Sequence, residues 1–204
     1  MRPDSIVFAV AGMCFGLILG WVIGVQQVGQ RPAAPVATAA APAGEGTGNA
    51  RQAPPLDEAR VQSLMTVIKN DPKNAGAALQ LANTYFDAER YTDAIKWYDE
   101  SLRIDPSNPD ASTDLGVSYY YTGQADRALQ QFERSLKLDP RHTKTMLNQG
   151  IVLAFGKQDL AGAQAAWKQV VALAPDSPEG QAAQRGLEGI KAAGHAGAAA
   201  TPGK

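Results

Sequence analysis

Apolar and polar positions divide the chain into three parts with different patterns. From Ile6 to Val25, twenty residues pass without a charged side chain. Residues 29–55 are rich in Ala, Pro and Gly and show no apolar periodicity. From Leu56 onward, apolar residues recur at the spacing of helices that bury one face. The pattern predicts an apolar helix, a linker and a helical domain, and therefore an all-α protein.

The apolar run is long enough to cross a membrane as a helix. At about 1.5 Å per residue it spans roughly 30 Å, the thickness of the hydrocarbon core of a bilayer. Trp21, near its end, suits the membrane interface. We predict an anchor over residues 1–28, with the transmembrane part at about 6–25. A cleaved signal peptide is the alternative, since small residues at 37–39 would suit cleavage, although its apolar region is usually about 7–15 residues long.

Glycine recurs at every fourth position of this run, at Gly12, Gly16, Gly20 and Gly24. Because backbone without side chains lets a second helix approach closely, this face predicts helix packing in the membrane and a homodimer through it. The alternative is that glycine is simply common in transmembrane helices. The few flanking charges encode the orientation weakly, and we expect a single-pass protein with its helical domain outside the cytoplasm.

The segment 29–55 lacks the apolar side chains that would offset the entropy lost on ordering. It is therefore predicted to be a disordered linker, which as a flexible coil would hold the domain roughly 30 Å from the bilayer. The C-terminal tail, residues 194–204, is similar in composition and is also predicted to be disordered.

A recurring dipeptide sets the period of the helical domain, predicted at 56–193. Asp71-Pro72, Asp105-Pro106 and Asp139-Pro140 lie 34 residues apart, and Ala174-Pro175 follows 35 residues later. A fixed period of this length indicates a repeat architecture. The predicted units are about 75–108, 109–142 and 143–177.

Small and large residues alternate at matching places in the three units. Small side chains would let two antiparallel helices approach: Ala82, Gly116 and Gly150 in the first helices, Ala94, Ala128 and Ala163 in the second. Large side chains would fill the space between them: Tyr85, Tyr119 and Leu153, then Tyr98, Phe132 and Trp167. Gly123 predicts a turn between the two helices of the second unit.

The third unit departs from this pattern, and the array is extended at both ends. It has Gln149 in place of leucine and one extra residue near 156–162, where we expect a looser turn. Residues 56–70 predict a helix before the first unit. A capping helix is predicted at 178–193, beginning with Ser177 as N-cap and Pro178 in the first turn.

The period and these packing positions resemble the tetratricopeptide repeat (TPR) family, which implies an α-solenoid of antiparallel helix pairs. The anchor, linker and repeats together resemble bacterial envelope proteins of this family. Residues 167–190 resemble the end of the repeat domains that hold apocytochrome during c-type cytochrome maturation. This resemblance implies a single-pass membrane protein with its repeats in the periplasm.

The resemblance also implies that the first helix of each pair lines a concave groove for a partner peptide. The residues at groove positions are Gln80, Asn83, Asp87, Asp114, Val117, Tyr120, Tyr121, Lys144, Asn148 and Phe155, together with Thr113 and Ile151. Alternatively, Tyr120 and Tyr121 pack against a neighbouring repeat. Because Lys144 is the one basic residue at these positions, an acidic C-terminal peptide is not the expected ligand.

Composition excludes several other classes of function. With 19 basic and 20 acidic residues there is no basic excess that would indicate nucleic acid. Cys14 is the only cysteine, and the two histidines, His142 and His195, lack further metal ligands at suitable spacing, so neither a metal site nor a cofactor is expected. No catalytic motif is present, and we expect no enzyme.

The leading hypothesis is a membrane-anchored scaffold or adaptor that holds a partner protein segment in its groove. Such a protein would act like a chaperone in the assembly of envelope proteins or of cytochrome c. The alternative is a structural component of a membrane complex, organised by the glycine face of the anchor.

Overall fold

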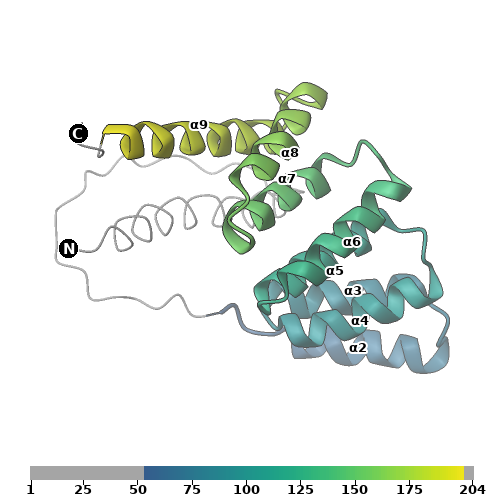
Figure 1. Ribbon diagram of the computed structural model, residues 1–204. Helices are drawn as coiled ribbons and strands as arrows, with labels where there is room; N and C mark the ends of the chain where they lie inside the picture. The colour runs from purple at the N-terminus through teal and green to yellow at the C-terminus, as the bar shows by residue number, and fades with distance from the viewer. Residues whose placement is uncertain (1–52, 200–204) are drawn as a thin grey trace, which may run out of the picture.

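The computed structural model describes residues 53–199 of the chain, and the side chains of 53–193 (Figure 1). The predicted membrane helix with its four glycines, most of the linker and residues 200–204 lie outside this range. Among the described helices, none combines the length and apolar character needed to cross a bilayer.

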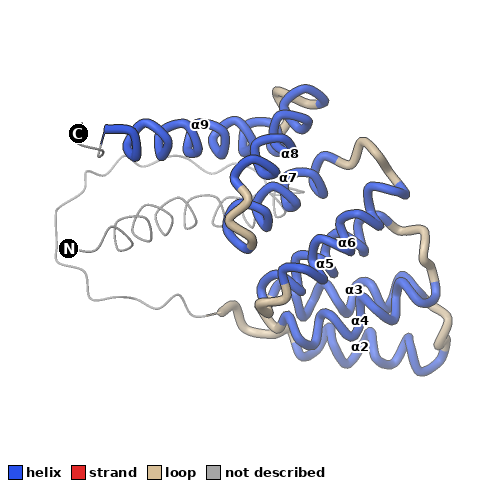
Figure 2. Tube along the Cα trace, viewed as in Figure 1, coloured by secondary structure: helices blue, strands red, loops and turns tan. Residues whose placement is uncertain are grey.

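The described residues form eight α-helices and one short π-helix, with no strand, which confirms the all-α prediction (Figure 2). The helices are α2 (Glu58–Asn70), α3 (Ala75–Asp87), α4 (Tyr91–Ile104), α5 (Pro109–Tyr121), α6 (Ala125–Leu138), α7 (Thr143–Ile151), the π-helix η1 (Val152–Gly156), α8 (Leu160–Leu173) and α9 (Pro178–Ala199).

Consecutive helices pack as pairs, α3 with α4, α5 with α6 and α7 with α8. At one end α2 lies against α3, and at the other α9 lies against α8 and α7 (Figure 1). The first helices of the three pairs begin at residues 75, 109 and 143. Each pair therefore contributes one 34- or 35-residue step of a solenoid.

Small residues allow the two helices of a pair to approach closely. A Cβ at Gly116 would lie 2.5 Å from Cε1 of Phe132, and one at Gly150 would clash with the indole of Trp167. Both aromatic side chains are fully buried. The indole N–H of Trp167 also donates to the carbonyl of Leu147 at 3.1 Å. Only glycine fits at these two positions while the rings keep their places.

Equivalent turns join the helices within each pair. Glu89, Gly123 and Gln158 occupy the same place in the three turns and have positive φ angles of 57°, 78° and 57°. The next residue donates its N–H back to the preceding helix, from Arg90 to Tyr85 and from Gln124 to Tyr119, both at 2.8 Å. These bonds satisfy carbonyls at the helix ends.

The π-helix η1 accommodates the extra residue of the third unit. The N–H of Lys157 donates to the carbonyl of Val152 at 3.0 Å, five residues back. From the sequence, the insertion was expected near residues 156–162. In the structure the extra residue lies within the π-helix, residues 152–156. A π-helical turn is wider than an α-helical turn and includes one more residue without breaking the helix.

Helix termini follow the sequence signals at most boundaries. Ser177 accepts the N–H of Gly180 at 3.0 Å, as predicted for an N-cap. Asp71, Asp105 and Asp139 each accept the N–H two residues ahead, which turns the chain toward the next unit. Helix α9 runs to Ala199, whereas the sequence analysis ends it at 193 and begins the tail at 194. Three of the six added residues are alanine, the best helix former, and two are glycine.

Candidate functional site

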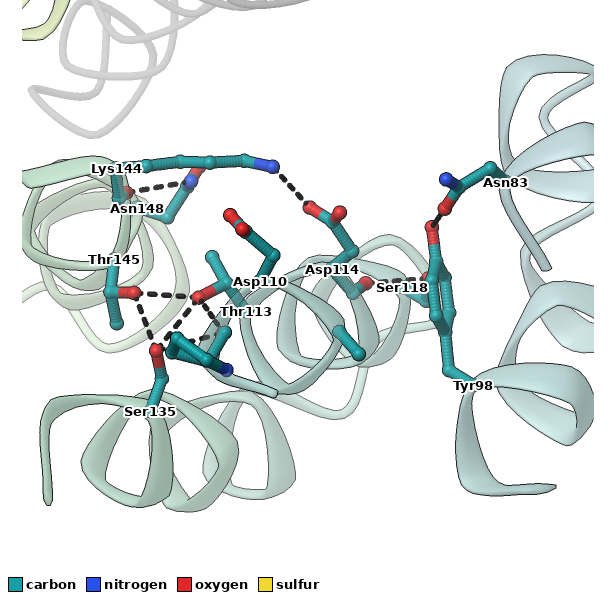
Figure 3. A network of polar contacts seen from close by, with 12 residues as sticks. Asn83, Tyr98, Asp110, Thr113, Asp114, Ser118, Ser135, Lys144, Thr145 and Asn148 are labelled. Atoms are coloured by element: carbon teal, nitrogen blue, oxygen red, sulfur yellow. Dashed lines mark hydrogen bonds and ion pairs between the residues drawn. The ribbon is translucent and has the colours of Figure 1, made fainter. Parts of the chain in front are cut away.

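The residues predicted to line a groove come from α3, α5, α7 and η1, the first-helix side of the array. Gln80 and Asp87 are exposed, whereas Asn83, Asp114, Val117, Tyr120, Tyr121, Lys144 and Phe155 are partly buried and Asn148 is buried. We refer to Asn83, Asp114, Lys144 and Asn148 as the polar row, because Figure 3 shows these side chains following one another along one side of the helices.

An ion pair between neighbouring repeats stands at the centre of the polar row. Lys144 Nζ lies 2.8 Å from Asp114 Oδ1, and the two side chains are 28% and 15% exposed. Apart from this ion pair, the buried Oδ1 has no hydrogen-bond donor among the residues that the structure describes. Burial raises the pKa of Asp114, although the ammonium of Lys144 opposes this. Burial alone lowers the pKa of Lys144, but the carboxylates of Asp114, Asp110 and Glu179 raise it overall.

The two amides of the polar row are oriented by the fold. The hydroxyl of Tyr98, a fully buried residue, donates to Asn83 Oδ1 at 2.7 Å, which leaves Nδ2 as the donor (Figure 3). Asn148 Nδ2 donates to the carbonyl of Lys144 at 2.9 Å, which leaves its oxygen as the acceptor. The polar row therefore has an oriented donor, Asn83 Nδ2, on one side of the ion pair. It has an oriented acceptor, Asn148 Oδ1, on the other side.

Asp87 adds a second carboxylate to the first-helix side. Partial shielding from water by the surrounding protein raises its pKa, the charge of Arg60 on α2 lowers it, and the charge of Asp114 raises it further. Asp87 and Asp114 therefore act on one another as like charges across neighbouring repeats.

The two tyrosines singled out by the sequence pack between repeats. Tyr121 stacks on Tyr91 with ring centroids 4.4 Å apart and lies edge-on to Phe86. Burial raises the pKa of Tyr91 to about 12. Tyr120 packs against the core of the second pair and that of the third. Both tyrosines keep a partly exposed surface, and their contact with a ligand stays a prediction.

Thr113 and Ile151 do not line the first-helix side, and this corrects the sequence analysis. Ile151 lies in the core formed by α7, α8 and α9. Thr113 is fully buried and forms a hydroxyl cluster with Ser135 and Thr145, at distances of 2.6 to 3.0 Å. A residue next to a groove position points about 100° away around the helix, so its side chain enters the interior.

This hydroxyl cluster and its link to the surface were not predicted from the sequence. Thr145 bonds Nδ1 of His142 at 2.5 Å, and Nε2 of His142 lies 3.2 Å from Asp110. The sequence does contain one signal for this cluster, because serine recurs at an interval of 34 residues, at Ser101 and Ser135. Ser101 donates to the carbonyl of Ala75 at 3.0 Å, and Ser135 donates to that of Pro109 at 2.9 Å. The repeated serines thus tie the second helix of a pair to the start of the first.

Metal-ligating side chains do not converge in the part of the chain that the structure describes: no three His, Cys, Asp or Glu residues are grouped so as to hold a metal ion. The chemistry on the first-helix side is that of charged pairs and oriented amides, which suits non-covalent recognition.

Two sequence-family matches identify the class of repeat. Residues 82–123 match a family described as TPR repeat, and residues 109–142 match one described as tetratricopeptide repeat. No curated protein sequence matches the chain. The chain therefore contains tetratricopeptide repeats across its first and second helix pairs.

Solved structures share the fold over a larger part of the chain. The TPR domain of Sgt2 from Aspergillus fumigatus is 25% identical with a TM-score of 0.56, covering 64% of this chain and 85% of that one. The first TPR of Spaghetti (RPAP3), bound to the HSP90 peptide SRMEEVD, is 26% identical with a TM-score of 0.54, covering 60% and 94%. The type III secretion translocator chaperone SycD of Yersinia enterocolitica is 22% identical with a TM-score of 0.55, covering 58% and 92%.

Proposed function

We propose that this protein is an adaptor that holds an extended segment of a partner protein on its first-helix side. The observation that carries this proposal is the polar row, in which the fold orients a donor on Asn83 and an acceptor on Asn148. An extended backbone presents carbonyl and N–H groups that such amides can bond. The similar RPAP3 structure, which contains a bound peptide, supports the same type of ligand.

We further propose that residues 1–28 anchor the adaptor in a membrane and that the repeats lie in the periplasm. The twenty-residue apolar run supports the anchor, and the linker would let the repeats reach segments away from the bilayer. The class of client that fits this arrangement is an envelope protein awaiting assembly, including an apocytochrome c. The function is binding and not catalysis.

Site-specific crosslinking tests both parts of the proposal. A photoreactive amino acid replaces Gln80, which is exposed on α3, or Gln130, which is exposed on α6, in the full chain in native membranes. We expect position 80 to crosslink a partner through a contiguous segment, as mapped by mass spectrometry, and position 130 to give no such product. The product should remain in the membrane fraction after an alkaline wash.

A second substitution separates groove binding from chance proximity. Asn83→Asp keeps an oxygen acceptor for the Tyr98 hydroxyl but removes the amide donor, and we expect it to reduce the crosslink from position 80 several-fold. Identical products from positions 80 and 130, or crosslinks only between copies of the chain, would contradict peptide capture. Release by the alkaline wash would contradict the anchor.

A further inference from the structure

The junction between the second and third helix pairs differs from the junction between the first and second. The first two pairs share one apolar core, with buried residues from α3, α4, α5 and α6. The third pair and α9 have a core of their own around Trp167. Apolar contact between the cores is made by Tyr120, which packs against both, by Val152 of η1 and by Leu136 of α6. The helices α7, α8 and α9 therefore form a unit beside α2–α6 (Figure 1).

Buried hydroxyl groups fill the middle of this junction. Thr113 of α5, Ser135 of α6 and Thr145 of α7 are fully buried and lie 2.6 to 3.0 Å from one another (Figure 3). In the preceding repeats the places of the two threonines are taken by Leu79 and Ala111, which pack in the shared apolar core. Hydroxyl groups bond to water when a junction opens, whereas apolar side chains lose the free energy of burial. Separation is therefore less costly at this junction than at the first.

Opposite charges face one another across the same junction. Lys144 of α7 lies 2.8 Å from Asp114 of α5. Lys157, which follows η1, lies 2.7 Å from Asp126 of α6. In both pairs the carboxylate belongs to the second helix pair and the ammonium group to the third. The third pair therefore meets the second as a basic face on an acidic one.

A further contact has the same sense, and the preceding junction has no equivalent of any of the three. His142 Nε2 lies 3.2 Å from Asp110, a contact that becomes an ion pair when the imidazole is protonated. The positions 34 or 35 residues earlier hold no pair of opposite charges, since they combine Gly76 with Asn108, Gln80 with Asp110 and Thr92 with Thr122. Arg127 and Arg134 do attract Asp99 across the preceding junction, but there the apolar core holds the repeats together. The close charged contacts thus belong to this junction and not to the repeat as such.

We propose that the third pair and α9 move as one unit against the first two pairs, and that the charged contacts of this junction hold the unit closed. Each contact stabilises the closed form modestly, because its partners keep exposed surface, so salt or one substitution shifts the balance. The polar row has Asn83 and Asp114 on one side of the junction and Lys144 and Asn148 on the other. Opening therefore separates the oriented donor of the row from its oriented acceptor.

Distances between spin labels at equivalent positions compare the two junctions. Residues 96, 130 and 165 occupy the same place on α4, α6 and α8, and all three are exposed. Labels are attached after Lys96→Cys with Gln130→Cys, or after Gln130→Cys with Ala165→Cys, in the full chain in mild detergent. Cys14→Ser removes the one native thiol, and dilution with unlabelled chain restricts the measurement to distances within one chain.

Salt should open the second of these junctions and not the first. At about 50 mM salt we expect pulsed dipolar spectroscopy to give mainly one distance for either label pair. At about 500 mM, where the screening length is roughly 4 Å, the 130–165 pair should show a second, longer distance. Its population should rise about two- to fivefold, as expected for weak ion pairs, while the 96–130 distance stays unchanged.

Reversal of one exposed pair assigns the effect to the charges. Asp126→Lys places a like charge beside Lys157 and should populate the longer 130–165 distance already at about 50 mM salt. Adding Lys157→Asp restores opposite charges and should close the junction again. Glu100→Lys is the matched control, because it places a like charge beside Arg103 within α4, and it should leave the 130–165 distance unchanged. Circular dichroism verifies that the variants keep their helices.

Three results would overturn the proposal. The first is a single 130–165 distance at both salt concentrations and in Asp126→Lys. The second is equal broadening for both label pairs, which would mean that the array bends uniformly. The third is failure of Lys157→Asp to reverse the effect of Asp126→Lys, which would mean that the charges do not hold the unit closed. Crosslinking at position 80 is a separate measurement, so none of these results decides whether the protein holds a partner segment.

Discussion

Gly116 shows how closely single residues are fixed in this array. A methyl group there would lie 2.5 and 2.8 Å from two ring atoms of Phe132 and 3.1 Å from the carbonyl of Ala128. The ring is fully buried and therefore has no room to move away. Gly189, in contrast, lies in a helix where a Cβ would meet nothing within 4 Å. The same substitution should thus have opposite effects at the two sites.

We expect Gly116→Ala to lower the free energy of unfolding by about 1–3 kcal/mol, the range for overpacking a core. Gly189→Ala should raise it by up to about 1 kcal/mol, because alanine is the better helix former. Urea unfolding of the full chain, followed by circular dichroism, compares both variants with the parent. Equal effects of the two substitutions would show that the Phe132 ring adapts to the added methyl group.

At this scale the sequence could predict which residues lie on the first-helix side but not the contacts between them. The resemblance to tetratricopeptide repeats assigned Asn83, Asp114, Lys144 and Asn148 to groove positions. It could not pair Lys144 with Asp114, because that contact depends on how two repeats stack. It also placed Thr113 on the wrong face, since neighbouring residues on a helix differ in direction by about 100°.

At the level of structural elements, the turns within the three helix pairs share one backbone conformation. The chain adopts a positive φ at Glu89, Gly123 and Gln158, although only the second is glycine. A side chain in the left-handed region costs about 1–2 kcal/mol. The bonds back to Tyr85 and Tyr119 hold the geometry whichever residue is present. The sequence therefore revealed this turn only where it contains glycine.

Exchanging glycine between two equivalent turns tests the conformation. Glu89→Gly should stabilise the protein, and Gly123→Ala should destabilise it, each by roughly 0.5–1 kcal/mol after allowing for the greater freedom of glycine in the unfolded chain. Thermal unfolding of the full chain measures both. A loss of stability in Glu89→Gly would mean that contacts of the glutamate side chain outweigh the backbone cost.

For the whole molecule, the repeat period predicted the all-α solenoid, but the recognisable signature is shorter than the fold. The family matches end at residue 142, where the third pair begins. That pair contains Gln149 and an extra residue, yet η1 absorbs the insertion and α8 still packs Trp167 onto Gly150. Packing thus preserves a repeat whose sequence has diverged. The end of α9 was missed because residues 194–199 include two glycines and no large apolar side chain that would show a helical period.

Helix α9 is expected to be required for the stability of the third pair. Its Ala182 and Ala183 join the core around Trp167, and Gly186 lies against the indole ring. Removing residues 178–204 should cost about 3 kcal/mol and shift tryptophan emission to longer wavelength, because a large core side chain becomes exposed. Removal of residues 200–204 alone is the control. Unchanged emission after the longer deletion would show that another segment covers Trp167.

Covering one end of the array also limits how copies of the chain could assemble. Helix α9 closes one end, whereas α2 leaves Met65 and Val67 exposed, at 44% and 41%, at the other. A head-to-tail filament needs two different surfaces that complement one another. Contacts made through the α2 surface alone would use it twice, which joins two copies by two-fold symmetry and then stops. Association through the α2 surface would therefore end at a dimer and would not grow with the number of chains present.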